Sequence, residues 1–229
     1  MIVGERKPLS EIRDLLGPAG RVLIVGCGTC VAVCLAGGEK EANILASQLK
    51  MASGLEGRRI KVDTTTLERQ CDREFLEPLA RTIADYEAVV SLACGAGVQL
   101  LAEKYPDRPV YPGVNTRFIG VAEGVGTWTE RCRACGQCLL GVTAGVCPVT
   151  RCAKGLLNGP CGGQTFDHCE TDPERTCAWI TIYDRLQARD RLDLLTRLRP
   201  PLDYAGRHRP DSLVHPAYKR RFSVDDEAV

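Results

Sequence analysis

The chain has 229 residues, a length that suits one large domain or two small ones. Its formal net charge is +1 and it has no basic stripe with interleaved aromatic residues, which argues against nucleic acid or a membrane surface as a partner. Thirteen cysteines far exceed ordinary usage, and their odd number argues against a pure disulfide scaffold.

The first residues, MIVGERKPLSEIRDLL, lack the apolar segment and the cleavage site of a secretory signal. The uncharged stretch 22–36 is too short to span a bilayer, and glycines and cysteines interrupt it. We therefore expect a cytoplasmic protein whose reduced thiols are available to bind metal.

Residues 1–125 alternate between expected strands and helices. The apolar runs that end in glycine are typical of buried parallel strands. Strands are predicted over 21–26, 59–67, 88–95, 108–115 and 117–124, and helices over 39–51, 73–84 and 98–104. This alternation predicts an α/β domain with a doubly wound parallel sheet of three to five strands, a small flavodoxin-like domain.

The rest of the chain has a different composition. Residues 126–184 are rich in glycine and cysteine and show little hydrophobic periodicity, which is typical of a loop-rich domain whose fold is fixed by metal ligands. With a terminal helix expected over 178–198, the segment 126–198 is predicted to be a ferredoxin-like iron–sulfur domain. Prolines and charges over 199–229 predict an extended tail, either docked on another surface or disordered.

Five cysteines lie where the predicted sheet would bind a ligand. Because the carboxyl ends of parallel strands form the binding crevice of an open sheet, loops at this edge would deliver thiolates to one iron–sulfur cluster. Cys27, Cys30 and Cys34 follow the first strand, Cys71 the second, and Cys94 ends the third. Five candidates compete for four positions, and we favour the first three together with Cys94, with Cys71 in reserve. Alternatively, Cys34 or Cys71 is not a ligand and acts only as a small buried hydrophobic residue.

The other eight cysteines fall within 46 residues and open with the spacing Cys-x-x-Cys-x-x-Cys. This spacing lets one turn of backbone aim several thiolates at one inorganic centre, and a later Cys-Pro step resembles the end of a bacterial ferredoxin run. Zinc sites usually use two paired knuckles, so we favour iron–sulfur and leave zinc open at one site. One division gives a first cluster Cys132, Cys135, Cys138 and Cys177, and a second cluster Cys147, Cys152, Cys161 and Cys169.

Motifs for other chemistry are missing from the sequence. The turn Gly26-Cys27-Gly28 begins like a dinucleotide-binding loop, but Val31 stands where the third glycine belongs. There is no phosphate-binding loop, nucleophile elbow or His-Glu-x-x-His sequence. We therefore expect no self-sufficient active site.

Three strings, GTWTERCRACGQC, GVCPVTRCAKGLLNGPCGG and CAWITIYDRL, resemble the methylenetetrahydrofolate reductase C-terminal domain family. VGCGTCVAVCLAGGEKEANILA, ERQCDREF and ACGAGVQ are similar to the rest of the MetV-type iron–sulfur subunits, and the resemblance covers about residues 20–200. It implies that the five N-terminal cysteines serve one cluster and the eight later ones serve others, two to three [4Fe–4S] clusters in all. It also implies a flavoprotein methylenetetrahydrofolate reductase as partner, which would itself bind flavin and folate.

The leading hypothesis is an electron-transfer subunit without catalytic residues of its own. It would pass electrons from a ferredoxin or a hydride-fed donor complex to the flavin of the reductase, in the methyl branch of one-carbon metabolism. The alternatives are a zinc-binding structural scaffold of the same complex and a reductive activator of a corrinoid protein.

Overall fold

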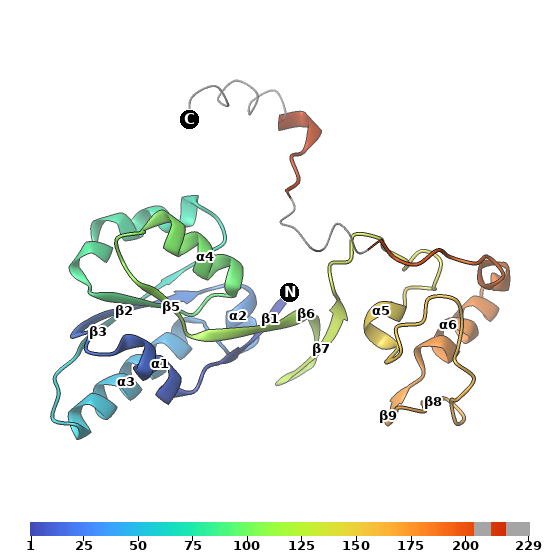
Figure 1. Cartoon of the computed structure of the whole chain (residues 1–229), viewed down its shortest axis with the longest axis horizontal. Helices are drawn as coiled ribbons and strands as arrows, with labels where there is room; N and C mark the ends of the chain where they lie inside the picture. Colours follow the sequence, from blue (N-terminus) through green and yellow to red (C-terminus); the bar gives the residue numbers. More distant parts are fainter. Residues whose placement is uncertain (204–211, 219–229) are drawn as a thin grey trace. The chain divides into compact units, whose positions relative to one another are not determined.

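The computed structural model describes residues 1–203 and 212–218, and the chain divides into two compact units, Met1–Arg133 and Ala134–Val229 (Figure 1). Within the described residues, no helix combines the length and apolar character that crossing a membrane requires.

The first unit is built on a parallel four-stranded sheet with the order β3-β2-β4-β5, which confirms the predicted α/β class. Its strands are β2 (Arg21–Cys27), β3 (Lys61–Leu67), β4 (Ala88–Ser91) and β5 (Val110–Pro112). The chain leaves β2 for β3 on one side and then returns to β4 on the other side. The strand order therefore reverses between β2 and β4, the place where open sheets bind their ligands.

Helices cover both faces of this sheet. They are α2 (Cys30–Val33), α3 (Glu39–Leu55), α4 (Gly95–Lys104) and the 3-10 segments η1 (Glu74–Arg81) and η2 (Ile83–Asp85). The helix predicted over 73–84 is thus only partly confirmed, because it consists of two 3-10 segments. Pro78 lies inside η1. Proline has no backbone N–H, so it cannot make the hydrogen bond to the carbonyl oxygen four residues earlier that an α-helix requires.

A second sheet in this unit is antiparallel and has the order β1-β6-β7. It consists of β1 (Ile2–Arg6), β6 (Val114–Gly124) and β7 (Thr127–Cys132), and helix α1 (Leu9–Leu16) follows β1. β6 was expected in the parallel sheet, but it is largely exposed along its length and lacks the continuous apolar run of a central strand. β7 pairs with β6 and so belongs to the first unit, although it lies beyond residue 125.

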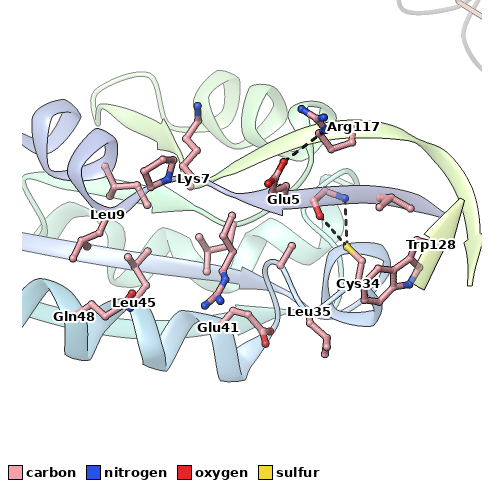
Figure 2. A pocket seen from close by; sticks show the side chains of 18 of the residues that line it. Glu5, Lys7, Leu9, Cys34, Leu35, Glu41, Leu45, Gln48, Arg117 and Trp128 are labelled. Atoms are coloured by element: carbon pink, nitrogen blue, oxygen red, sulfur yellow. Dashed lines mark hydrogen bonds and ion pairs between the residues drawn. The ribbon is translucent and has the colours of Figure 1, made fainter. Parts of the chain in front are cut away.

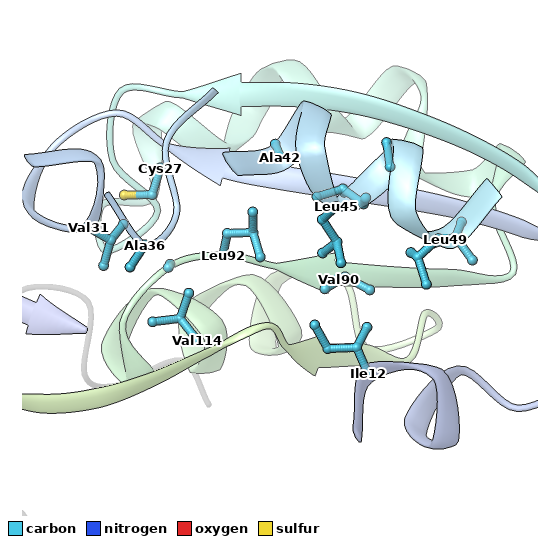
Figure 3. Close-up of a cluster of buried hydrophobic side chains, with 14 of the residues drawn as sticks. Ile12, Cys27, Val31, Ala36, Ala42, Leu45, Leu49, Val90, Leu92 and Val114 are labelled. Carbon is cyan, nitrogen blue, oxygen red and sulfur yellow. The ribbon is translucent and has the colours of Figure 1, made fainter. Parts of the chain in front are cut away.

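Alternation along the central strands divides the core of the first unit into two layers. Val89 packs with η1, η2 and α4 on one face, whereas the next residue, Val90, packs with α3 and α1 on the other. In Figure 3, Leu45 and Leu49 of α3 face Val90 and the residue that follows β4, Leu92. These two layers fix the positions of the strand ends.

The second unit has short elements and one small core. The elements are α5 (Pro148–Arg151), β8 (His168–Cys169), β9 (Asp172–Thr176), α6 (Ala178–Gln187), η3 (Leu192–Leu195) and η5 (Pro216–Tyr218). Its core surrounds Trp179, which is 2% exposed and donates its indole N–H to the Leu156 carbonyl oxygen at 3.1 Å. The predicted helix over 178–198 ends early, since Asp190 has a left-handed backbone with φ of 53°.

Arg199 ties the loops of this unit together. Its guanidinium donates to the carbonyl oxygens of Leu157 at 2.9 Å and Leu194 at 3.2 Å. The tail predicted over 199–229 falls mostly on residues 204–211 and 219–229, which lie outside the described residues.

Candidate metal centres

Four cysteines lie at the carboxyl edge of the parallel sheet. Cys27 is the last residue of β2, and Cys30 is the first residue of α2. Cys71 lies in the loop after β3, and Cys94 caps α4 directly after β4. This edge includes the point where the strand order reverses, so the sheet topology itself brings these loops together.

The other three thiols influence the pKa of Cys71. Partial desolvation raises the pKa of the Cys71 thiol, and negative charge on Cys94, Cys27 and Cys30 raises it further. Four thiolates gathered in this way repel one another unless a cation lies between them. A bound metal ion reverses this effect and deprotonates its thiol ligands.

Gln70 holds the Cys71 loop against the sheet. This side chain is fully buried, and its amide nitrogen donates to the carbonyl oxygens of Val25 at 2.9 Å and Gly26 at 3.0 Å. Its amide oxygen accepts from the Ser91 hydroxyl at 2.7 Å. Gln70 directly precedes Cys71, so its hydrogen bonds fasten the Cys71 loop to the ends of β2 and β4. Sequence analysis missed it, because nothing in the local sequence distinguishes it from an exposed glutamine.

Cys34 stands apart from the other four. Its sulfur accepts the Gly4 backbone N–H at 3.4 Å and lies 3.6 Å and 3.5 Å from the carbonyl oxygens of Gly4 and Val31. Two nearby carbonyl acceptors suit a protonated thiol better than a metal-bound thiolate. The structure therefore favours Cys71 over Cys34 as the fourth ligand, the reverse of the preference drawn from the sequence.

Four more cysteines line one small cavity of about 20 Å³ in the second unit. They come from well-separated positions in the sequence, and Trp179 forms part of the same wall. The four cysteines are Cys152, Cys161, Cys169 and Cys177. This grouping puts Cys177, and not Cys147, in one set with the other three cysteines of the cavity. The spacing in the sequence had suggested the opposite assignment of these two residues.

The surroundings of this cavity suit thiolate ligands. The Thr171 hydroxyl oxygen lies 3.1 Å from the Cys169 sulfur. A hydrogen bond from this hydroxyl, together with backbone N–H groups, lowers the pKa of the Cys169 thiol. The Gly163 N–H donates to the Cys161 sulfur at 3.4 Å. The amide oxygen of Gln164 is buried without a hydrogen-bond partner and belongs to a residue of the same wall. An unsatisfied buried acceptor is unusual in a folded protein, and this one can accept a hydrogen bond from a donor at the cavity wall.

The remaining four cysteines are less gathered. Cys132 ends β7 in the first unit, and Cys135 and Cys138 follow in the first loop of the second unit. Cys147 caps α5, with Pro148 at its first position. The structure assigns no common cavity to this set, so its grouping rests on its spacing in the sequence.

Across residues 1–203 and 212–218, no three Cys, His, Asp or Glu side chains are arranged closely enough to hold a metal ion as they stand. The donors at the edge of the parallel sheet and at the cavity of the second unit nevertheless suit a soft metal, because both sets consist of thiols that come from separate loops. Binding would require the thiols in each set to draw together around the metal.

Part of the chain matches a known protein family. Residues 111–205 match the family model described as methylene-tetrahydrofolate reductase C terminal. The match covers less than half of the chain. It includes all eight later cysteines and none of the five N-terminal ones. Neither the curated proteins nor the solved structures yielded a match.

Proposed function

We propose that this chain is an iron–sulfur electron-transfer subunit that serves a flavin-containing methylenetetrahydrofolate reductase. The observation that supports it best is the distribution of its thirteen cysteines. Four converge at the end of the parallel sheet, four line the cavity of the second unit, four follow ferredoxin-like spacing, and Cys34 is left over. Three sets of four ligands match the ligand number of [4Fe–4S] clusters.

Each set has a defined task under this proposal. Cys27, Cys30, Cys71 and Cys94 would hold the N-terminal cluster, and Gln70 would fix the position of Cys71. Iron–sulfur clusters supply one-electron transfer when bound, at potentials set by nearby hydrogen bonds and by solvent exposure. In the second unit, the Gly163 N–H and the Thr171 hydroxyl are among the groups that donate to ligand sulfurs.

The third set follows from spacing and elimination. Cys132, Cys135, Cys138 and Cys147 are the cysteines outside the other two sets and away from Cys34. Their Cys-x-x-Cys-x-x-Cys spacing and the later Cys-Pro step resemble a bacterial ferredoxin run. We propose them as ligands of one further cluster.

The partners follow from the resemblance of the matched segment to the reductase family. Electrons would come from a ferredoxin or a hydride-fed donor complex and leave to the flavin of the reductase subunit, which would also bind folate. A corrinoid-activating role would instead require turnover that depends on cobalamin. The chain contributes ligands and hydrogen bonds, and it places no catalytic group on the substrate.

One observation favours zinc at a single site. The cavity lined by Cys152, Cys161, Cys169 and Cys177 has a volume of about 20 Å³, close to the space that one water molecule needs. A single tetrahedral Zn²⁺ with four cysteine ligands fits that space with less movement than a four-iron cluster. The second candidate is therefore a chain with two clusters and one structural zinc.

Metal analysis of the whole chain, prepared without oxygen, separates these readings. With three clusters we expect about twelve iron atoms and as much acid-labile sulfide per chain, and no zinc. With two clusters and one zinc site, iron and sulfide fall to about eight each and one zinc appears. Zinc without iron would leave only a structural scaffold and would refute electron transfer.

A further inference from the structure

The first unit contains a large cavity that none of the proposed metal ligands lines. We propose that this cavity binds a planar aromatic anion, a small organic molecule that carries a ring system and a carboxylate, sulfonate or phosphate group. Its volume is about 670 Å³, within the range of small-molecule sites. The proposal is independent of the metal content of the chain.

The cavity lies between β1 and α3 (Figure 2). Leu45 on α3 and Ile12 on α1 are buried side chains of its wall, as is Leu92 after β4. Apolar walls of this kind bury the body of a ligand but do not orient it. Orientation requires polar groups that the fold has not already used.

Two acidic residues of the lining, Glu41 and Glu5, already interact with other groups of the protein. Glu41 is buried, and its carboxylate accepts the Gly38 N–H at 3.0 Å at the start of α3. Glu5 lies 3.7 Å from the Arg117 guanidinium, and both side chains lie on the side of β1 away from α3 in Figure 2. Glu5 is therefore paired with a cation, whereas the Glu41 carboxylate is held by a backbone N–H at the positive end of the α3 helix dipole.

Arg6 is the cation left to bind a ligand. Figure 2 shows Glu5 on the side of β1 away from α3. Because successive side chains of a strand alternate between its faces, this places Arg6 on the opposite face of β1, the one toward α3. It lines the cavity, and among the described residues its guanidinium has neither a hydrogen bond nor an ion pair. A guanidinium in this situation favours a carboxylate, sulfonate or phosphate, which it can bind through two hydrogen bonds.

Two aromatic side chains also line the cavity. Trp128 on β7 and Phe118 on β6 are both half-buried, and Figure 2 shows Trp128 beside Cys34. Indole and phenyl faces stack on planar rings, and each such pair adds to the energy of apolar burial. A ring against Trp128 and an anionic group at Arg6 define the ligand class.

Equilibrium dialysis of the full chain with two matched probes tests this assignment. 1-Anilinonaphthalene-8-sulfonate carries the ring and the anion, whereas N-phenyl-1-naphthylamine has the same rings without the charge. We expect the sulfonate to bind saturably, with one molecule per chain. Arg6→Gln should weaken the sulfonate by about tenfold and leave the neutral probe unchanged. Trp128→Leu should weaken both probes.

Arg59→Gln is the matched control, because Arg59 is exposed, lies outside the cavity and likewise has neither a hydrogen bond nor an ion pair from its guanidinium within the described part of the chain. It should change neither affinity. Failure of the sulfonate to saturate would overturn the proposal. So would equal effects of Arg6→Gln and Arg59→Gln, because the anion would then bind elsewhere. Iron and zinc contents do not enter this test, so its failure is distinct from failure of the proposed function.

Discussion

The thiol of Cys34 uses its hydrogen-bonding capacity on backbone groups, whereas Cys71 is exposed and the charges of three other thiols raise the pKa of its own thiol. Cys34 is buried and packs within the apolar core of the first unit. A free buried cysteine behaves as a small hydrophobic residue. The two residues therefore respond differently to removal of sulfur.

Alanine variants at these two positions distinguish a ligand from a core residue. Cys71→Ala removes a cluster ligand, and we expect a loss of about four iron atoms and four sulfides per chain. Cys34→Ala should keep the full metal content and lower the free energy of unfolding by about 1 kcal/mol through lost packing. Iron and sulfide assays on anaerobically purified variants measure the difference. An equal loss of iron in both variants would show that Cys34 is also a ligand.

At the scale of elements, Gln70 joins the ends of two strands. It bonds to β2 through two carbonyl oxygens and to Ser91 of β4 through its amide oxygen. All three partners lie close to the edge where the N-terminal cysteines converge. The loop that carries Cys71 is therefore held by a buried polar network as well as by apolar packing.

Gln70→Leu should disrupt this network. The substitution removes an amide donor from the Val25 and Gly26 carbonyl oxygens and the acceptor of the Ser91 hydroxyl, so we expect the free energy of unfolding to fall by about 2–3 kcal/mol. The iron bound at the N-terminal site should fall with it, because Cys71 loses its anchor. Urea unfolding and iron assay measure the two effects.

Gln99→Leu provides the control for this variant. Gln99 is exposed on α4, and its amide donates to the Gly95 carbonyl oxygen one turn earlier in the same helix. Its replacement should change unfolding by no more than about 0.5 kcal/mol. If Gln70→Leu were as mild as Gln99→Leu, the buried network would not stabilise the site.

The elements also show what sequence patterns determine. The continuous apolar runs of β2 and β4 predicted buried parallel strands, and both are central in the sheet. Pattern alone missed β1 and α1 and placed β6 in the wrong sheet, because partner choice among short strands depends on tertiary packing. Spacing located every candidate cysteine, but grouping them required the fold, since ligands of one set come from different loops.

At the scale of the whole chain, the two units differ in how much apolar core holds them. The first unit has apolar layers on both faces of its parallel sheet. The described part of the second unit has one core cluster around Trp179, in which the proposed ligand Cys177 is itself buried. Short elements with so small a core depend on cross-links such as metal sites for their stability.

Metal removal should therefore affect the two units unequally. After iron and zinc are stripped by oxidation and chelation, we expect amide hydrogens over residues 134–203 to exchange much faster, because their fold loses its cross-links. Amides of β2 and β4 should stay protected, since their hydrogen bonds lie within a sheet that is buried on both faces. Hydrogen-exchange mass spectrometry of the metal-loaded and stripped chain resolves both regions in one experiment. Protection over 134–203 that survives stripping would mean that the core around Trp179 suffices to hold the second unit, and uniform loss in both units would mean that the first also depends on metal.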